Sequence, residues 1–400
     1  MFGRKFRPPR RRKHPAARRV AGNFLPNVRG RAATPRGISM QTGAMDPVQA
    51  LEEIASLLEV QLASPFKAKA FRRAAGVIGP LDDDELRARA ADGRLKRTPG
   101  IGDSSLGVIV EALDGKVPGY LADLREKAGV ETATGLRALL RGDLHAHSDW
   151  SDGTTSIAAM ARAAASAGLE YFALTDHSPT LRVANGLSPE RLESQLEIVG
   201  ALNAGLGEPD RDDAGDARDR GDLGVRILTG IEVDILEDGV LDQRPDLLDR
   251  LDVVVASVHS KLRAPRDVMT KRMLRAIRDP RMNVLGHCTG RLVQGSRGTR
   301  PQSEFDAEAV FAACAEHDVA VEINSRPERQ DPPDDLIAIA IEAGCRFSID
   351  TDGHAPGHFG FLALGAARAE AAGIPPERIV TTWDAERLVD WAGSKKRVAP

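Results

Sequence analysis

From residue 141 onward the chain alternates short apolar segments with amphipathic segments, and this alternation constrains the fold more than any other feature. The apolar segments have strand length, and we predict seven strands, at 142–147, 171–177, 225–235, 252–259, 283–287, 319–324 and 347–354. The intervening sequence has helical periodicity, for example at 155–168, 267–279 and 307–317. Strands that alternate with helices form parallel βα units. Because the strand ends carry similar polar clusters, the pattern favours an α/β fold closed into a seven-stranded barrel over an open sheet.

The chain before residue 130 has a different character. Residues 46–129 contain no strand pattern, and apolar spacings of three and four predict helices at 46–62, 65–79, 81–93 and 95–115. The last of these includes the tight turn Pro99-Gly100-Ile101-Gly102. We expect a linker at 130–140 and a solvated, charged loop at 205–222.

Residues 1–45 carry twelve Lys and Arg side chains and no acid, and they are rich in Pro and Gly. We predict a disordered basic extension. It is either an arm that tethers the protein to nucleic acid or an upstream extension, with translation starting at Met40 or Met45.

Charge and cysteine content narrow the functional classes. The chain after residue 45 has 43 basic and 58 acidic side chains. This acidic balance argues against nucleic-acid binding over the whole surface but suits the binding of divalent cations. The three cysteines show no C-x-x-C spacing, so neither a disulfide framework nor a thiolate zinc site is indicated. No apolar run approaches the ~18 residues of a membrane span, and no secretory leader is recognisable. We expect a cytoplasmic protein without a membrane partner, in an oligomeric state that the sequence does not determine.

Histidines and acids follow the predicted strands. Nine of these groups are candidate metal ligands: His145, His147, Asp152, His177, Glu232, His259, His287, Asp352 and His354. Side chains at i and i+2 of a strand point to the same face, so His145 and His147 can reach one ion. A single strand histidine is usually a core residue, but the repetition at five strand ends indicates a metal site. Imidazoles mixed with carboxylates suit zinc, manganese or iron better than calcium or a lone magnesium.

The motifs DLHAHSDWSDG, LTDHS, GIEVDI, SVHS, GHCTGR and DTDGH, in this order, resemble the PHP (polymerase and histidinol phosphatase) family of trinuclear metal phosphoesterases. The resemblance covers about residues 141–393 and is closest to the PHP domain of bacterial family X DNA polymerases. ASPFKAKAFRRAA and the PGIG turn resemble the helix-hairpin-helix domain of the same polymerases. The resemblance implies a helix-hairpin-helix DNA-binding domain at 46–129 and a PHP phosphoesterase domain, a distorted (β/α)7 barrel, at 141–400.

The resemblance also implies three divalent metal ions, of zinc, manganese or iron, and a distribution of their ligands. One ion would be held by His145, His147 and Asp352. Glu232 would bridge to a second ion held by His259 and His287. The third would be held by Asp152, His177 and His354.

Two departures from the polymerases limit the activities expected. Only about a dozen residues separate the two domains, where those polymerases carry palm, fingers and thumb, so DNA synthesis is not expected. The hairpin helix GIGDSSLGVIVEAL has no lysine at the place of the Schiff-base amine, so deoxyribose-phosphate lyase activity is not expected.

A metal cluster of this kind suits hydrolysis of a phosphate ester, with Glu232 at its centre. Arg291 and Lys261, which follow metal-ligand motifs, are candidates to bind phosphate oxygens, or they are ordinary charges at the loop mouths. Glu322 and Asp350 are candidates to orient ligand imidazoles, or they are simple strand-end acids.

For DNA, the hairpin glycines Gly100 and Gly102 would expose backbone N–H groups to a phosphate. Four basic residues lie in a helix nearby, and they are either a DNA contact or a solvated face: Lys67, Lys69, Arg72 and Arg73.

The leading hypothesis is a metal-dependent phosphoesterase that acts on nucleic-acid ends, as a 3'-5' exonuclease or 3'-end phosphatase in DNA repair. One alternative is a small-molecule phosphatase of the histidinol-phosphatase type, and another is a non-catalytic protein that binds DNA ends. An amidohydrolase barrel also begins with H-x-H, but it needs a bridging lysine that the segment VVVASVHS lacks.

Overall fold

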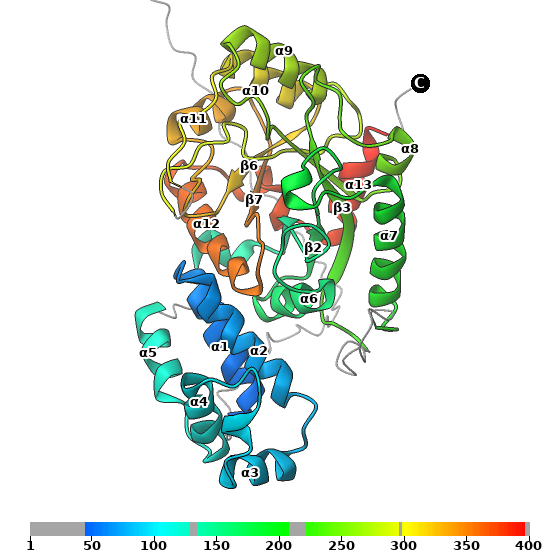
Figure 1. Ribbon diagram of the computed structural model, residues 1–400. Helices are drawn as coiled ribbons and strands as arrows, with labels where there is room; N and C mark the ends of the chain where they lie inside the picture. The colour runs from blue at the N-terminus through cyan, green and yellow to red at the C-terminus, as the bar shows by residue number, and fades with distance from the viewer. Residues whose placement is uncertain (1–44, 129–133, 208–220, 296–297, 397–400) are drawn as a thin grey trace, which may run out of the picture. The chain divides into compact units, whose positions relative to one another are not determined.

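The computed structural model describes residues 45–128, 134–207, 221–295 and 298–396 (Figure 1). The predicted basic extension, apart from its last residue, and most of the predicted charged loop at 205–222 lie outside the described residues.

The segment before residue 129 is helical, as predicted. Its described α-helices are α1 (Pro47–Val60), α2 (Pro65–Ile78), α3 (Asp83–Ala91), α4 (Asp103–Leu113) and α5 (Gly119–Ala128), with a short 3-10 turn, η1 (Leu95–Arg97). The Asp46 side chain caps α1 by accepting a hydrogen bond from the Gln49 amide at 2.8 Å. Leu51, Ile54 and Leu58 of α1 are buried in the core shared by these helices. The three-and-four spacing seen in the sequence is therefore the buried stripe of α1.

The turn before α4 depends on its glycines. Gly100 has a φ of +98°, and a Cβ atom there would lie 3.1 Å from Val77 Cγ2. Gly102 precedes α4, and its amide donates to Ser105 Oγ at 2.9 Å. Helix α4 begins directly after this turn, so the structure has the predicted glycine turn at a helix N-terminus.

The second part of the chain contains one parallel sheet. Its strands follow chain order, and each pairs in parallel with the next. The strands are β1 (Gly142–Ala146), β2 (Tyr171–Leu174), β3 (Arg226–Asp234), β4 (Val253–Ser257), β5 (Val284–Leu285), β6 (Ala320–Asn324) and β7 (Phe347–Asp350).

The first and last strands meet at their carboxyl ends, which nearly closes the barrel. Ala146 forms a parallel bridge with Gly353, and the His147 amide donates to the Gly353 carbonyl at 2.7 Å. The pairing of β1 with β2 shifts register between Asp143 and Ala146. An irregularity of this kind changes where side chains point, and this one flanks His145. The predicted seven-stranded α/β barrel is confirmed.

Helices connect and cover the strands (Figure 1). They are α6 (Ile157–Ser166), α7 (Pro189–Asn203), α8 (Pro245–Leu248), α9 (Arg266–Ile277), α10 (Ala307–Glu316), α11 (Asp334–Glu342), α12 (Leu362–Ala371) and α13 (Ala385–Ser394). Alternate strand residues such as Phe172 and Val254 share a core with helix residues such as Phe311. Their neighbours along the strands belong to a separate cluster, as expected when a strand alternates between the two faces of a barrel wall.

That separate cluster fills the amino-terminal end of the barrel. It joins the first residues of β4, β5 and β6 to Leu388 and Trp391 of α13. The side-chain amide of Asn283, just before β5, donates to the Ala392 carbonyl at 2.9 Å. Helix α13 therefore plugs the end of the barrel opposite to the predicted metal ligands.

Part of the predicted linker packs against the barrel. Residues Gly135–Leu139 form a 3-10 helix, η2, and the buried side chains of Leu136 and Leu140 belong to the barrel core. Arg137 donates to the Ala167 carbonyl at 2.8 Å.

Among the helices of the described residues, none has the length and apolar character that spanning a bilayer requires.

Candidate metal centre

The nine predicted ligands lie at the carboxyl ends of the strands, and the structure brings them together. Glu232 is inside β3, and His145 is inside β1. The others lie in the segments that follow β1, β2, β4, β5 and β7. These segments are adjacent because all strands run in the same direction.

Glu232 is at the centre of the group, and its side chain is 1% exposed. Its Oε1 lies 2.9 Å from His287 Nε2 and 3.3 Å from His259 Nε2. Its Oε2 lies 2.9 Å from His177 Nδ1 and 3.2 Å from His145 Nε2. One carboxylate thus faces imidazoles from four different strand ends.

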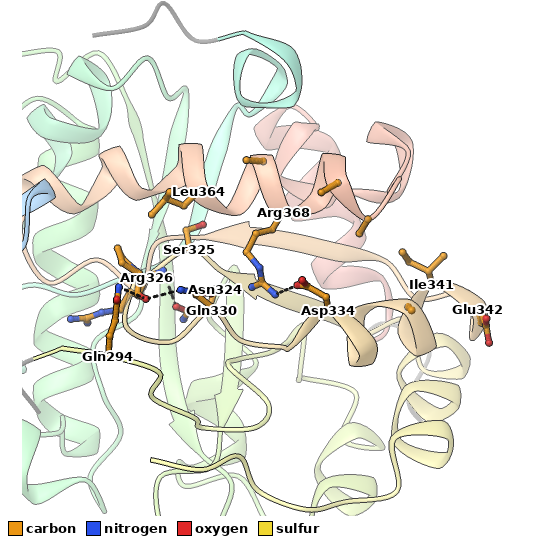
Figure 2. Close-up of a pocket in the computed structure, with 15 residues that line it drawn as sticks. Gln294, Asn324, Ser325, Arg326, Gln330, Asp334, Ile341, Glu342, Leu364 and Arg368 are labelled. Carbon is orange, nitrogen blue, oxygen red and sulfur yellow. Dashed lines mark hydrogen bonds and ion pairs between the residues drawn. The ribbon is translucent and has the colours of Figure 1, made fainter. Parts of the chain in front are cut away.

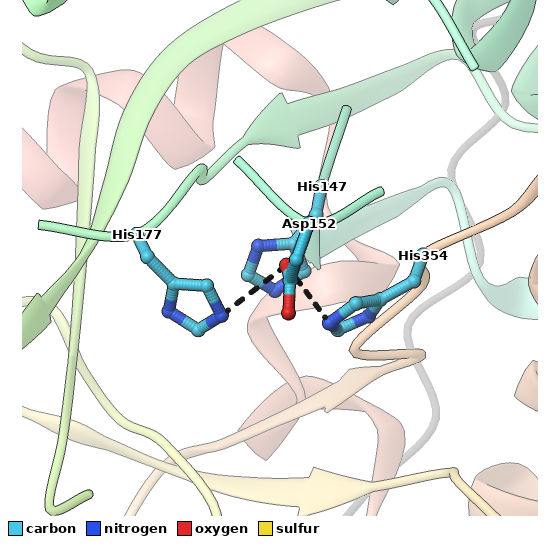
Figure 3. Close-up of side chains that lie close together, drawn as sticks. All are labelled: His147, Asp152, His177 and His354. Atoms are coloured by element: carbon cyan, nitrogen blue, oxygen red, sulfur yellow. Dashed lines mark ion pairs between the residues drawn. The ribbon is translucent and has the colours of Figure 1, made fainter. Parts of the chain in front are cut away.

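A second group surrounds Asp152 (Figure 3). Asp152 Oδ1 lies 3.5 Å from His177 Nε2 and 3.3 Å from His354 Nε2. The His147 ring lies close by, tilted against that of His354 with 4.2 Å between the ring centroids. The ligand atoms of these four residues lie within 4.8 Å of one another, so they can hold one ion.

Three further groups meet the same limit of 4.8 Å. They are His145, His147 and Asp352; His145, Glu232 and His287; and His177, Glu232 and His259. His145, His147, His177 and Glu232 each belong to two of the four sets. The set of His145, His147 and Asp352 matches the implied distribution, whereas His259 and His287, which the resemblance implies for one ion, fall in different sets.

The donor atoms themselves fit cations. Among the described residues, both Glu232 oxygens, His145 Nε2, His259 Nε2 and His287 Nε2 are buried without a hydrogen-bond partner. Burying unsatisfied polar atoms is costly. Bound divalent cations would satisfy all of these atoms at once, so the residues present fit a metal cluster.

Other side chains fix the orientation of the imidazoles. Glu322 Oε1 lies 2.6 Å from His145 Nδ1, as the sequence suggested, and its Oε2 accepts the His287 amide at 2.5 Å. Asp234, which sequence reasoning missed, lies 2.7 Å from His259 Nδ1. When a carboxylate accepts a hydrogen bond from Nδ1–H of a neutral imidazole, Nε2 keeps its free electron pair for a metal.

His354 is oriented by the backbone. Its Nδ1 lies 2.8 Å from the Asp352 carbonyl, which leaves Nε2 toward Asp152. Asp350 was a candidate either to orient an imidazole or to be a simple strand-end acid, and its Oδ1 accepts the Leu144 amide at 2.7 Å. Asp350 therefore supports the pairing of β1 with β7.

The electrostatics of the centre differ between its members. Burial, reinforced by the charges of His354 and His177, lowers the pKa of His147 to about 3, so this ring is neutral at pH 7. Burial opposes protonation of His259, but the Glu232 and Asp234 carboxylates outweigh it and raise the pKa of His259 to about 9. Burial also opposes ionisation of Glu232, but the surrounding histidines hold its pKa well below the usual range. Glu232 is therefore ionised.

Two arginines beside the centre were missed. Arg326 and Arg329 follow β6, and they are 8% and 6% exposed. Arg329 Nε donates to Asp352 Oδ2 at 2.8 Å, and Arg326 Nη1 donates to the Asp352 carbonyl at 3.2 Å. The sequence signal that could have indicated them was their place in SRPERQD, the segment that follows the predicted strand at 319–324.

The two predicted phosphate-binding cations have other surroundings. Arg291 donates from Nε to the Arg329 carbonyl at 3.1 Å and from Nη2 to the Gln330 carbonyl, so it supports the loop after β6. Lys261 is exposed two residues beyond His259, and its φ is +54°. A phosphate contact for either residue remains a prediction.

The predicted DNA contacts lie in the helical segment. Lys67, Lys69 and Arg73 are exposed, whereas Arg72 forms an ion pair with Glu59 at 2.6 Å. A cavity of about 360 Å³ lies between α2 and the start of α4, lined by Lys67, Ala70, Phe71, Gly102, Asp103, Ser104, Ser105 and Tyr120. Lys67 and the glycine turn thus share one concave surface.

A larger cavity of about 720 Å³ lies beside α11 and α12 (Figure 2). Figure 2 shows Asn324 and Arg326 at one end and the ion pair of Arg368 with Asp334 farther along. Asn324 Nδ2 donates to Asp352 Oδ2 at 3.2 Å. The cavity therefore shares a wall with the metal centre.

Comparisons with known proteins agree with this geometry. The sequence profile of the PHP domain matches residues 143–326. The "Probable phosphatase YcdX" of Escherichia coli K12 is 30% identical over 181 residues, which cover 43% of this chain and 69% of that protein. The chain belongs to the PHP family. A helix-hairpin-helix profile matches residues 44–117 of the same PHP chain.

A longer relative of the PHP chain is the "DNA polymerase/3'-5' exonuclease PolX" of Bacillus subtilis 168. The two are 39% identical over 215 residues, which are 54% of this chain and 34% of that protein. The present chain thus spans about a third of the length of this relative. These relatives support assignment of the PHP chain as a hydrolase.

Among solved structures, histidinol phosphate phosphatase from Lactococcus lactis, crystallised with zinc, L-histidinol and phosphate, matches with a TM-score of 0.39 and 18% identity. The match covers 58% of this chain and 92% of that one. This likeness is too low to carry an argument.

Proposed function

We propose that this PHP protein is a metal-dependent phosphoesterase that hydrolyses phosphate esters at nucleic-acid ends, as a 3'-5' exonuclease or 3'-end phosphatase. The observation that carries the proposal is the group of nine candidate ligands centred on Glu232, six of them buried, in which several donor atoms lack a hydrogen-bond partner among the described residues. We expect three divalent ions of zinc, manganese or iron.

When bound, such ions lower the pKa of a coordinated water and neutralise charge on a phosphoryl group. The residues of the chain have the tasks of holding and orienting. Glu232 would bridge two ions, while Glu322 and Asp234 would fix the rings of His145 and His259. Lys261, exposed beside His259, would contact a phosphate oxygen of the substrate.

The preference for nucleic acid rests on the helical segment. Gly100 and Gly102 form the turn that leads into α4, and backbone amides at a helix N-terminus bind phosphate without sequence preference. Lys67 and Ser104 line the cavity at that turn. The PolX relative, whose name includes a 3'-5' exonuclease, supports the same substrate class.

The test is a side-by-side assay of the purified protein loaded with Mn²⁺ or Zn²⁺. The substrates are 3'-recessed DNA, 3'-phosphoryl DNA and histidinol phosphate, and the control is metal-stripped protein. Release of nucleotides or of 3'-phosphate, dependent on metal, is the expected result.

A second candidate is a small-molecule phosphatase, which the match to most of the YcdX phosphatase favours. Hydrolysis of histidinol phosphate alone would select this candidate. Binding of DNA ends without turnover of any phosphate ester by metal-loaded protein would refute the enzyme and leave a DNA-end-binding protein.

A further inference from the structure

The two oxygens of the Asp352 carboxylate have different surroundings. Oδ2 accepts hydrogen bonds from Arg329 Nε at 2.8 Å and from Asn324 Nδ2 at 3.2 Å. Among the described residues, Oδ1 accepts no hydrogen bond of this kind; it lies 3.6 Å from His147 Nε2 and 3.5 Å from Arg326 Nη1. Asp352 also has a φ of +50°, so its backbone is held in the left-handed region.

Placing Arg329 here is electrostatically adverse to cation binding. Arg329 is 6% exposed, and its Nε lies 2.8 Å from Oδ2 of the candidate ligand Asp352. A fixed positive charge beside a cation site repels the cation, with little solvent to screen it. The benefit of Arg329 must therefore come from the hydrogen bond that it makes.

We propose that Arg329 is a positioning residue that, with Asn324, holds Asp352 Oδ2 and thereby reserves Oδ1 as a single metal-binding oxygen. A free carboxylate can rotate and bind an ion through both oxygens. With Oδ2 engaged by two donors, Asp352 offers one ligand atom to the ion that it shares with His145 and His147. The inference rests on the proposed metal site but not on the identity of the substrate.

A positioning role and a purely electrostatic role of Arg329 predict opposite changes in metal affinity when Arg329 is removed. If Arg329 acted only through its charge, its removal would strengthen cation binding. If it acts by holding Asp352, its removal weakens binding at the Asp352 position by about 10- to 100-fold, the range for residues that orient metal ligands. The sign of the change separates the two.

The experiment measures metal affinity by competition with a chelator, and metal content by elemental analysis, for wild type, Arg329→Met and Arg329→Lys. Arg368→Met is the matched control, because Arg368 holds the neighbouring Pro332 carbonyl and Asp334 but does not contact Asp352. The visible spectrum of cobalt-loaded protein reports coordination number, and circular dichroism reports folding.

In Arg329→Met we expect a lower metal affinity at one position and an altered cobalt spectrum. In Arg368→Met we expect the affinity and the spectrum of the wild type. Arg329→Lys keeps the charge but loses the planar donor, so its metal affinity should lie between those of the wild type and Arg329→Met. Unchanged or tighter binding by folded Arg329→Met would overturn the proposal, as would an equal loss in Arg368→Met. If Arg329→Met does not fold, Arg329→Lys decides, and wild-type affinity at every position would then overturn it.

Discussion

At the scale of single residues, Glu232 connects more of the centre than any other ligand. It lies inside a strand, so its position is set by the barrel wall rather than by a loop. His145, His177, His259 and His287 reach it from segments that are far apart in sequence.

Replacing Glu232 with glutamine tests its bridging role. Glutamine keeps the size of the side chain but removes the charge that two ions would share, so we expect fewer metal ions per chain, with affinity lowered at least about 10-fold. Elemental analysis of the purified variant measures this. Glu237→Gln, at an exposed position after the same strand, should retain the wild-type metal content, and an unchanged content in Glu232→Gln would contradict the bridging role.

Asp234→Asn tests the orientation of His259. An amide can donate toward Nδ1 and favour the tautomer whose Nε2 carries the proton, which cannot bind a metal. We expect metal affinity to fall by about 10- to 100-fold, measured by chelator competition. The exposed Asp238→Asn is the control, and equal affinities of the two variants would argue against the role of Asp234.

The nine ligands could be predicted because their residue types recur at strand ends. The side chains that orient these ligands were harder to predict, because the sequence spacing does not show which charged side chain points into the site. Glu322 and Asp350 looked equivalent in the sequence, yet one contacts an imidazole and the other the Leu144 amide. The difference arises from the closure of β1 against β7, which joins segments about two hundred residues apart.

At the scale of elements, the strand count was predictable, since each strand is a buried apolar run between helical segments. The extent of the strands was not, because β5 has two residues in the structure and its polar continuation belongs to the site. The placement of α13 was also beyond the sequence. An amphipathic helix after the last strand gives no sign of which surface it covers, and here it packs on the first residues of β4, β5 and β6.

Leu388→Ala tests the contribution of α13. Leu388 is fully buried in the cluster at the amino-terminal end of the barrel, and the truncation leaves a cavity there. We expect the free energy of unfolding to fall by about 2 to 5 kcal/mol, measured by denaturant titration. The folded variant should keep its metal content, because the site lies at the other end. Leu364→Ala, at a half-exposed position of α12, should cost much less, and equal losses would speak against the plug.

At the scale of the whole molecule, the chain combines a helix-hairpin-helix segment with a PHP barrel, and its match to the PolX relative covers about a third of that relative. The helix-hairpin-helix segment and the PHP barrel could each be predicted from its own sequence motifs. The roles of individual basic residues in the helical segment could not be predicted, since the ion pair of Arg72 with Glu59 depends on how α1 and α2 pack.

The double substitution Lys67→Ala with Lys69→Ala tests whether that segment serves the barrel. We expect KM for 3'-recessed DNA to rise, and the salt dependence of DNA binding to weaken by about one unit for each phosphate that the variant no longer binds. Hydrolysis of bis(p-nitrophenyl) phosphate should not change, because this substrate is too small to need the helices. Lys116→Ala, an exposed lysine of the same segment, is the control, and wild-type DNA kinetics in the double variant would contradict the role of these lysines in binding DNA.

The position of α13 has a consequence for how a polymer could be processed. The barrel interior is filled by strand side chains, and Leu388 and Trp391 close its amino-terminal end, so the barrel is not a tunnel. A strand of nucleic acid cannot be threaded through it, so whatever enters must withdraw by the same opening.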